Sequence, residues 1–326
     1  MKNIFTILLA FVFGFLPSGS VFSQNVKVYE TLGAFEGPIE NAIESTKLLM
    51  QERGLEVLSE LQAGMPNGCS FPAAVISYVD PESSSDLIQI DAKTAPYALV
   101  NRIVLFEDEA GGHIAFVNPL SIYRTVFQDN AKSKTLAQEH RAKVRRIFGT
   151  TQSREYGQAR SKGLIGKTMG VMAGGPFDKK IESLVVLPQR SVAEVAAQIE
   201  ERFSASSGKW GLEIGFRYDV NELNATIFGV AGREMEAKSF SIVGAGSDES
   251  RGDYVCPGTA YAAAYPLEMV VMQVDADVHI QFVSAMFRMK MYFEDAGKWA
   301  FMKNMSMPGS LAGEMKDRIE AATMSR

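Results

Sequence analysis

Two distant stretches of this chain share a short motif, and a cysteine precedes each of them at the same distance. Residues 106–116 read FEDEAGGHIAF, and residues 293–301 read FEDAGKWAF. Cys69 and Cys256, the only cysteines among 326 residues, each lie 37 positions before the first Phe of that motif. Self-similarity at a fixed spacing is typical of a repeated unit. The sequence therefore predicts two copies of one domain, with the cysteines at equivalent places.

Each predicted copy opens with a strand followed by an amphipathic helix. In the first copy, residues 26–32 read as a strand, and apolar residues recur at helical spacing over 39–50. In the second copy, residues 183–187 read as a strand, and Ser191 is a typical N-cap for a helix over 192–203. The same order of elements in both copies supports a repeat.

Paired strands are predicted after each cysteine. In the first copy, residues 102–106 and 114–117 flank an acidic, Gly-containing turn. In the second copy, residues 289–293 and 299–302 flank the corresponding turn. The expected fold is α+β, a duplicated antiparallel sheet with helices, whose two copies are related by a pseudo-two-fold axis.

Patterns along the chain divide it into four parts. Residues 1–23 form a signal peptide, 24–127 the first α+β domain, 128–175 a basic helical and Gly-rich connector, and 176–326 the second α+β domain. Two cysteines and three histidines are too few for a four-thiolate zinc site or a histidine-rich metal centre.

The N-terminus has the features of a secretory signal. Lys2 supplies the positive end, residues 4–16 are an apolar run, and Ser23 precedes the expected cleavage point at Gln24. The apolar run is shorter than the ~20 residues that a spanning helix needs. We therefore expect a soluble protein, periplasmic or secreted, in an oxidising compartment.

The connector carries an excess of positive charge. Residues 128–170 contain ten Lys or Arg against three acids, and Leu136, His140, Val144 and Ile147 trace one helical stripe. This pattern favours a helix that docks on the protein's own acidic domains. Peripheral contact with a membrane surface is the alternative. Nucleic acid is not an expected partner, because aromatic residues are not interleaved with the charges.

The two cysteines leave three alternatives open. Equivalent positions near a pseudo-two-fold axis could meet in a disulfide between Cys69 and Cys256. Two separately buried thiols would fit equally well, because free cysteine is among the most buried residue types. A reactive or metal-binding thiol is the third alternative.

A methionine cluster from Met286 to Met307 repeats the spacing Met-x-x-Met-x-Met twice. A hairpin turn at 296–297 would place Met291 opposite Met302 and on the same face as Met289. Three thioethers that converge could select Cu(I). Core filling by methionine is the favoured alternative, and Cu(I) is the one cofactor that the sequence suggests.

Several of these pieces resemble a bacterial family, the domain of unknown function 302. They are a Cys-Ser-Phe-Pro run at 69–72, the hairpin LVNRIVLFED at 99–108 and Asn-Pro at 118–119, with looser matches at 256–257 and 292–295. The resemblance implies a fold similar to the TATA-binding protein, an antiparallel sheet with helices on one face, and association in pairs. A second family cysteine is replaced here by Asn101, so the resemblance does not imply two-thiol chemistry within one domain.

The leading functional hypothesis is an exported binding or interaction protein with two repeated domains. Its unknown small ligand or protein partner would bind in the groove or on the sheet face between the halves. One alternative is thiol-redox or Cu(I) chemistry at Cys69, Cys256 and the methionine cluster, and another is an enzyme of unknown reaction. No nucleophile with a base and no cofactor fingerprint can be assembled from the sequence, so no catalytic residue is assigned.

Overall fold

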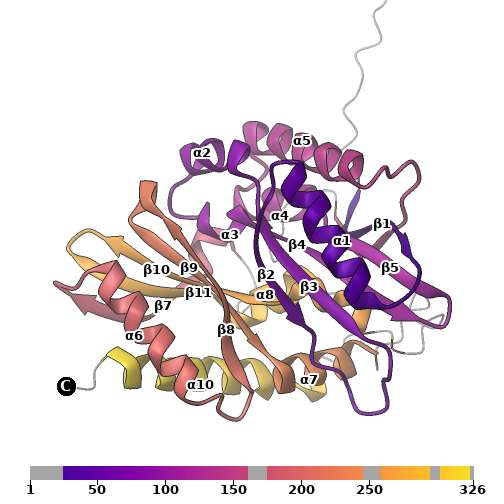
Figure 1. Ribbon diagram of the computed structural model, residues 1–326. Helices are drawn as coiled ribbons and strands as arrows, with labels where there is room; N and C mark the ends of the chain where they lie inside the picture. The colour runs from indigo at the N-terminus through magenta and orange to yellow at the C-terminus, as the bar shows by residue number, and fades with distance from the viewer. Residues whose placement is uncertain (1–24, 161–174, 245–255, 257, 294–301, 324–326) are drawn as a thin grey trace, which may run out of the picture.

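Two antiparallel sheets organise the protein (Figure 1). The computed structural model describes residues 25–160, 175–244, 256, 258–293 and 302–323. The first sheet has the order β2-β3-β4-β5-β1-β6. Its strands are β1 (Val26–Phe35), β2 (Glu56–Gln62), β3 (Ala73–Val79), β4 (Val100–Asp108), β5 (Gly111–Val117) and β6 (Glu155–Arg160).

The second sheet has the order β7-β11-β10-β9-β8. Its strands are β7 (Ile181–Pro188), β8 (Leu212–Val220), β9 (Ala225–Gly232), β10 (Leu267–Val274) and β11 (Asp277–Val283). Apart from β6, each strand of the first sheet therefore has a counterpart in the same place of the second.

Helices cover the sheets and fill the space between them. The helices of the first half are α1 (Ile39–Glu52), α2 (Pro81–Ile90), α3 (Pro96–Leu99), α4 (Pro119–Val126) and α5 (Ala131–Ile147). Those of the second half are α6 (Val192–Ala205), α7 (Arg233–Gly244), α8 (Ala285–Phe293) and α10 (Ser306–Thr323), with 3₁₀ turns η1 (Phe177–Lys179), η2 (Asn221–Leu223) and η4 (Thr259–Ala264). Figure 1 shows α1 across the first sheet and α6 across the second, with α10 beside α6.

Strand register identifies individual residues that correspond between the two sheets. In the first half β4 pairs with β5 so that Ile103 faces Phe116. In the second half β10 pairs with β11 so that Met269 faces Phe282. Each residue of the second pair stands 166 positions after its counterpart. The predicted fold class, α+β with a repeated sheet-plus-helix arrangement, is confirmed.

The opening elements of both halves are also confirmed. The strand predicted at 26–32 lies in β1, and the one predicted at 183–187 lies in β7. Apolar spacing gave α1 and α6 correctly because their buried residues lie on one helical face. The Ser191 hydroxyl accepts a hydrogen bond from the backbone N–H of Glu194 at 3.2 Å, so it caps α6.

The second predicted hairpin is wrong at its first strand. Residues 289–293 form the end of α8, and residues 299–301 of the expected partner strand lie outside the described part of the chain. Phe287 and Met291, four residues apart, are both buried, as on one face of a helix. The hairpin in the corresponding place of the second sheet is β10 with β11, so the two Phe-Glu-Asp motifs do not lie at corresponding places.

The basic segment belongs to the first half. Its helix α5 packs on α4, and β6 extends the first sheet by pairing with β1. The predicted stripe is confirmed at Leu136, His140 and Val144, which are buried. Arg141 binds the carboxylate of Glu30 at 2.6 Å. The basic helix therefore docks on acidic groups of the protein itself, as expected. Contact with a membrane stays a prediction.

One apolar core extends through both halves, and a second apolar cluster lies within the first half. The edge strands β2 and β8 lie side by side (Figure 1), and a Cβ at Gly215 would come within 2.5 Å of Leu61 Cδ1. Glycine at this position therefore permits the close approach of the two edges. Among the described residues, none of the helices has the length and apolar character needed to cross a membrane.

Candidate functional site

A buried ion pair joins the two sheets at equivalent positions. Arg102 of β4 and Glu268 of β10 stand 166 positions apart, the same offset as the hairpin pairs. The Arg102 guanidinium contacts Glu268 Oε1. Arg288 Nε of α8 donates to Glu268 Oε2 at 3.0 Å. One carboxylate is thus shared by two guanidinium groups, and all three side chains are buried.

Backbone carbonyls around η4 complete this network. Arg102 Nη1 donates to the carbonyl of Ala263 at 3.1 Å. Arg288 Nη2 donates to the carbonyls of Ala264 at 2.6 Å and Pro266 at 3.1 Å. Burial lowers the pKa of both guanidinium groups. These acceptors offset part of the cost of placing two cations in the protein interior.

Tyr292 of α8 lies between the two arginines. Arg102 Nη1 donates to its hydroxyl at 3.2 Å, and the Arg288 guanidinium lies 4.7 Å from its ring centroid. Burial alone would raise the pKa of Tyr292, but the charges of Arg102 and Arg288 lower it below its ordinary value. The site therefore carries a positive field that Glu268 alone does not cancel.

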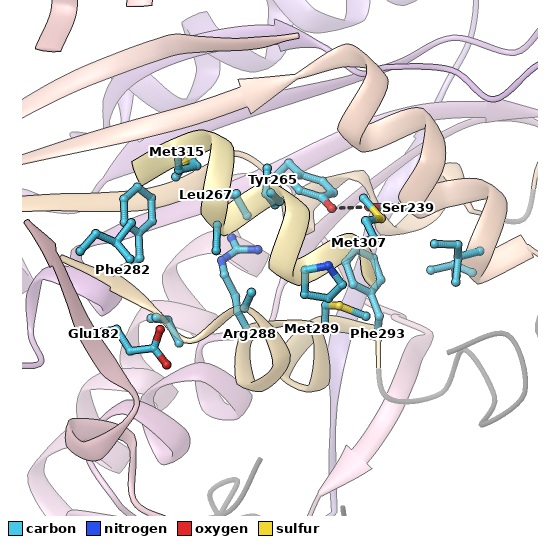
Figure 2. Close-up of a pocket in the computed structure, with 18 residues that line it drawn as sticks. Glu182, Ser239, Tyr265, Leu267, Phe282, Arg288, Met289, Phe293, Met307 and Met315 are labelled. Carbon is cyan, nitrogen blue, oxygen red and sulfur yellow. Dashed lines mark hydrogen bonds between the residues drawn. The ribbon is translucent and has the colours of Figure 1, made fainter. Parts of the chain in front are cut away.

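An apolar pocket lies beside this network, within the second half (Figure 2). Its walls come from α7, α8 and α10 and from the ends of β7, β10 and β11, with Ile242, Phe282, Met289 and Leu311 as representative residues. Its volume is about 90 Å³. The hollow is thus not a groove between the two sheets, which is where the sequence led us to expect a ligand.

Few polar groups line the pocket, and two of them are already satisfied. The Tyr265 hydroxyl and Ser239 Oγ lie 2.5 Å apart and share the hydrogen bond that is dashed in Figure 2. Ser239 Oγ donates to the carbonyl of Met235 at 2.9 Å. Tyr265 is therefore the donor in its bond with Ser239. Burial raises the pKa of Tyr265 to about 12, so the hydroxyl stays protonated at neutral pH. Arg288 and Glu182 are the charged residues of the lining.

A disulfide ties the two halves together. Cys69 and Cys256 are bonded, with their Cα atoms 5.6 Å apart. Of the three alternatives that the sequence left open, the structure contains this one. Cys69 lies in the connection from β2 to β3, however, and Cys256 lies between α7 and η4. The cysteines therefore do not occupy equivalent places, and their equal offset from the Phe-Glu-Asp motif is a coincidence.

The three methionines proposed as Cu(I) ligands do not converge. Met289 lines the pocket, Met291 is buried, and Met302 is 56% exposed. Because Met289 and Met291 are two residues apart on α8, their side chains leave the helix about 200° apart. Met307 and Met315 of α10 line the pocket with Met289 instead. No group of three His, Cys, Asp or Glu that could hold a metal occurs among the residues the structure describes.

Sequence reasoning missed Glu236 and also the polar partners of His140, a residue that it had placed on the buried stripe of α5. Glu236 of α7 accepts hydrogen bonds from the backbone N–H of Gly64 at 2.7 Å and of Gly232 at 3.2 Å, which links the halves. In the first half, His140 lies 3.0 Å from the Tyr78 hydroxyl and 3.4 Å from Asp80 Oδ2. The latter trio resembles a catalytic relay, but all three side chains are buried, so it stabilises the packing of α5.

The signal for Arg288 was present in the sequence. It is one of two cations, with Lys290, in a stretch of α8 whose other residues are apolar or aromatic, and a cation is seldom buried without a specific partner. No sequence pattern pointed to the pocket itself, because each wall helix shows only an ordinary apolar face.

Comparison with known proteins gives little further information. No family model matches this chain, and no curated protein matches it. One similar solved structure is the "Crystal structure of uncharacterized conserved protein DUF302 from Bacillus stearothermophilus". It is 13% identical, has a TM-score of 0.31, and the match covers 40% of this chain and 97% of that one. A likeness of this size carries no argument about function.

Proposed function

We propose that this chain is an exported protein that binds a small, largely apolar molecule in the pocket between α7, α8 and α10. The observation that carries the proposal is an apolar hollow of about 90 Å³ with a buried guanidinium, that of Arg288, in its lining. Concave apolar sites with a few placed polar groups are the usual form of small-molecule sites.

The pocket suits a short apolar chain or small ring. Its volume corresponds to roughly six to nine water molecules. Met289, Met307 and Met315 contribute flexible thioether side chains to the lining. Methionine adapts its shape to a ligand at low cost, so the walls can follow a chain that is not rigid.

Export is supported by the signal-like pattern of residues 1–23, which lie outside the described structure. The disulfide between Cys69 and Cys256 agrees with an oxidising compartment. We therefore propose that the protein works in the periplasm or outside the cell.

We further propose that the halves are tandem copies of one ancestral domain that resembles the domain of unknown function 302. The equal strand order and the constant offset between paired hairpins support this. By that offset the counterpart of Arg288 is Ile122 of α4. Only the second copy would thus have an arginine at this position to bind a ligand.

Fluorescence titration with N-phenyl-1-naphthylamine tests the binding proposal on the mature chain. The neutral probe brightens in apolar sites and should be displaced by short-chain lipids. Ala312→Phe fills the pocket from α10, and Ala193→Phe adds the same ring at an exposed position of α6 as a matched control. We expect the Ala312 variant to lose the probe signal and the Ala193 variant to keep it. Equal titrations in variants that melt alike would refute the proposal.

Cu(I) binding is a second candidate for the same pocket, because three thioethers line it. Anaerobic competition against a Cu(I) chelator tests this candidate with Met289→Leu and Met307→Leu combined. Thioether coordination predicts a large loss of Cu(I) affinity, and an unchanged affinity would rule it out.

A further inference from the structure

We infer that the ligand of this pocket is an apolar acid whose carboxylate binds Arg288. This inference rests on the proposed binding function and adds the chemical class of the ligand. Medium-chain carboxylates are the simplest molecules of that class.

The contacts of Arg288 leave one amino group unused. Nε and Nη2 are bound to Glu268 and to two carbonyls. Nη1 makes no hydrogen bond to any residue in the described part of the chain, and it is not among the side-chain atoms sealed from solvent without a partner. Arg288 is 7% exposed and lines the pocket. An unused donor of a buried cation that is still reachable is suited to a ligand oxygen.

Figure 2 shows how this side chain lies. Arg288 extends from α8 with its guanidinium end toward Leu267, another residue of the lining. A ligand oxygen on Nη1 would therefore lie beside Leu267, with the apolar part of the molecule against the other walls.

The local charge favours an anion. Arg102 and Arg288 share the single carboxylate of Glu268, so the buried group keeps one uncompensated positive charge among these three residues. Coulomb interactions are stronger in such an interior than in water. The lowered pKa of Tyr292 reflects the same field. A ligand carboxylate would supply the missing negative charge.

The other polar groups of the lining restrict the class of ligand further. The Tyr265 hydroxyl donates to Ser239 Oγ, and Ser239 Oγ donates to a backbone carbonyl. Neither hydroxyl therefore has a free donor for a sugar or another polyhydroxyl ligand. Glu182 of β7 is exposed and repels a carboxylate on its side of the pocket. One charged head at Arg288 and an apolar tail fit this distribution.

Isothermal titration calorimetry on the mature protein with octanoate and 1-octanol tests the inference, because the two probes share the chain and differ in the head. We expect octanoate to bind at least about tenfold more tightly than 1-octanol, because a charge-assisted hydrogen bond contributes a free energy of about that size. Arg288→Met should remove that preference. Glu182→Gln, a change at an exposed residue, should increase it by about twofold.

A pH series keeps the inference testable if the Arg288 variant does not fold. Octanoate binding to the unmodified protein should weaken as the ligand is protonated below about pH 5, while 1-octanol binding should not follow that curve. Equal affinities for the two probes at pH 7 would overturn the inference and leave the proposed function standing. If neither probe binds and N-phenyl-1-naphthylamine does not bind either, the proposed function itself fails.

Discussion

Arg102 of β4 and Glu268 of β10 occupy the same position in the two sheets and form a buried ion pair across the junction. Residues at equivalent positions meet in this way when the two halves are arranged about a pseudo-two-fold axis. Because Arg288 shares the carboxylate, the pair connects the junction of the halves to the lining of the pocket.

Removing the carboxylate of this pair should destabilise the protein strongly. Glu268→Gln leaves two buried guanidinium groups without a counter-charge, and we expect the free energy of unfolding to fall by about 3–5 kcal/mol. Urea denaturation measures the change. Asp86→Asn breaks the exposed pair with Lys132 and serves as the control, with an expected cost below about 1 kcal/mol. Similar small losses in both variants would contradict the role given to Glu268.

The disulfide should add substantial stability. It closes a sequence separation of 187 residues, and the loop-entropy relation gives at most roughly 5 kcal/mol for a loop of that size. Cys69→Ser combined with Cys256→Ser should unfold at lower urea concentration and should match the reduced native chain. Thiol titration of the denatured, unreduced protein should find no free thiol, and two free thiols would show that the bridge is absent.

Stability should depend on pH through Glu236. Burial raises the pKa of Glu236 to about 7, although the N–H groups of Gly64 and Gly232 act against this shift. The pKa of Glu236 is higher in the folded protein than in the unfolded chain. Its contribution to stability is therefore fully present at a pH below the pKa of the unfolded chain, and it is lost as the pH rises through about 7. The loss is roughly 3 kcal/mol.

Glu236→Gln tests this dependence, since the amide mimics the protonated acid. Glu213 and Arg233, the charged groups whose fields act on Glu236, stay in place. Melting temperatures between pH 5 and pH 8 should fall more steeply for the natural protein than for the variant, roughly as linkage requires. Parallel curves would contradict the raised pKa.

A methyl group at Gly64 should disturb the contact between the halves. Its Cβ would lie 2.0 Å from the backbone oxygen of Arg233, which cannot move aside as a flexible side chain can. We expect Gly64→Ala to cost about 1–3 kcal/mol in urea denaturation. Gly313→Ala on α10 is the control, because nothing lies within 4 Å of its Cβ, and it should stabilise by up to about 1 kcal/mol. A neutral Gly64 variant would show that the loop is free to shift.

Local patterns gave the opening strands and helices of both halves because each has one buried face. Alternation and helical spacing report burial directly, as in α1 and α6. The second hairpin was misplaced because a motif of nine to eleven residues was taken as the mark of a repeat. The strands that correspond to β4 and β5 share their register but not their sequence, so only the fold identifies β10 and β11.

The pocket, like the second hairpin, could be identified only from the fold. Its walls come from α7, α8 and α10, whose apolar faces are indistinguishable in sequence from those of a filled core. Whether such faces leave a hollow depends on how the helices pack. The partners of Arg288 also lie in β10 and around η4, a placement that follows from the tertiary fold.

A crystal structure of residues 24–326 grown with saturating octanoate would locate the proposed ligand. We expect octanoate to lie between α8 and α10, with a carboxylate oxygen about 3 Å from Arg288 Nη1 and the chain against the apolar walls. Octanoate bound elsewhere, or a pocket that stays empty at saturation, would contradict it.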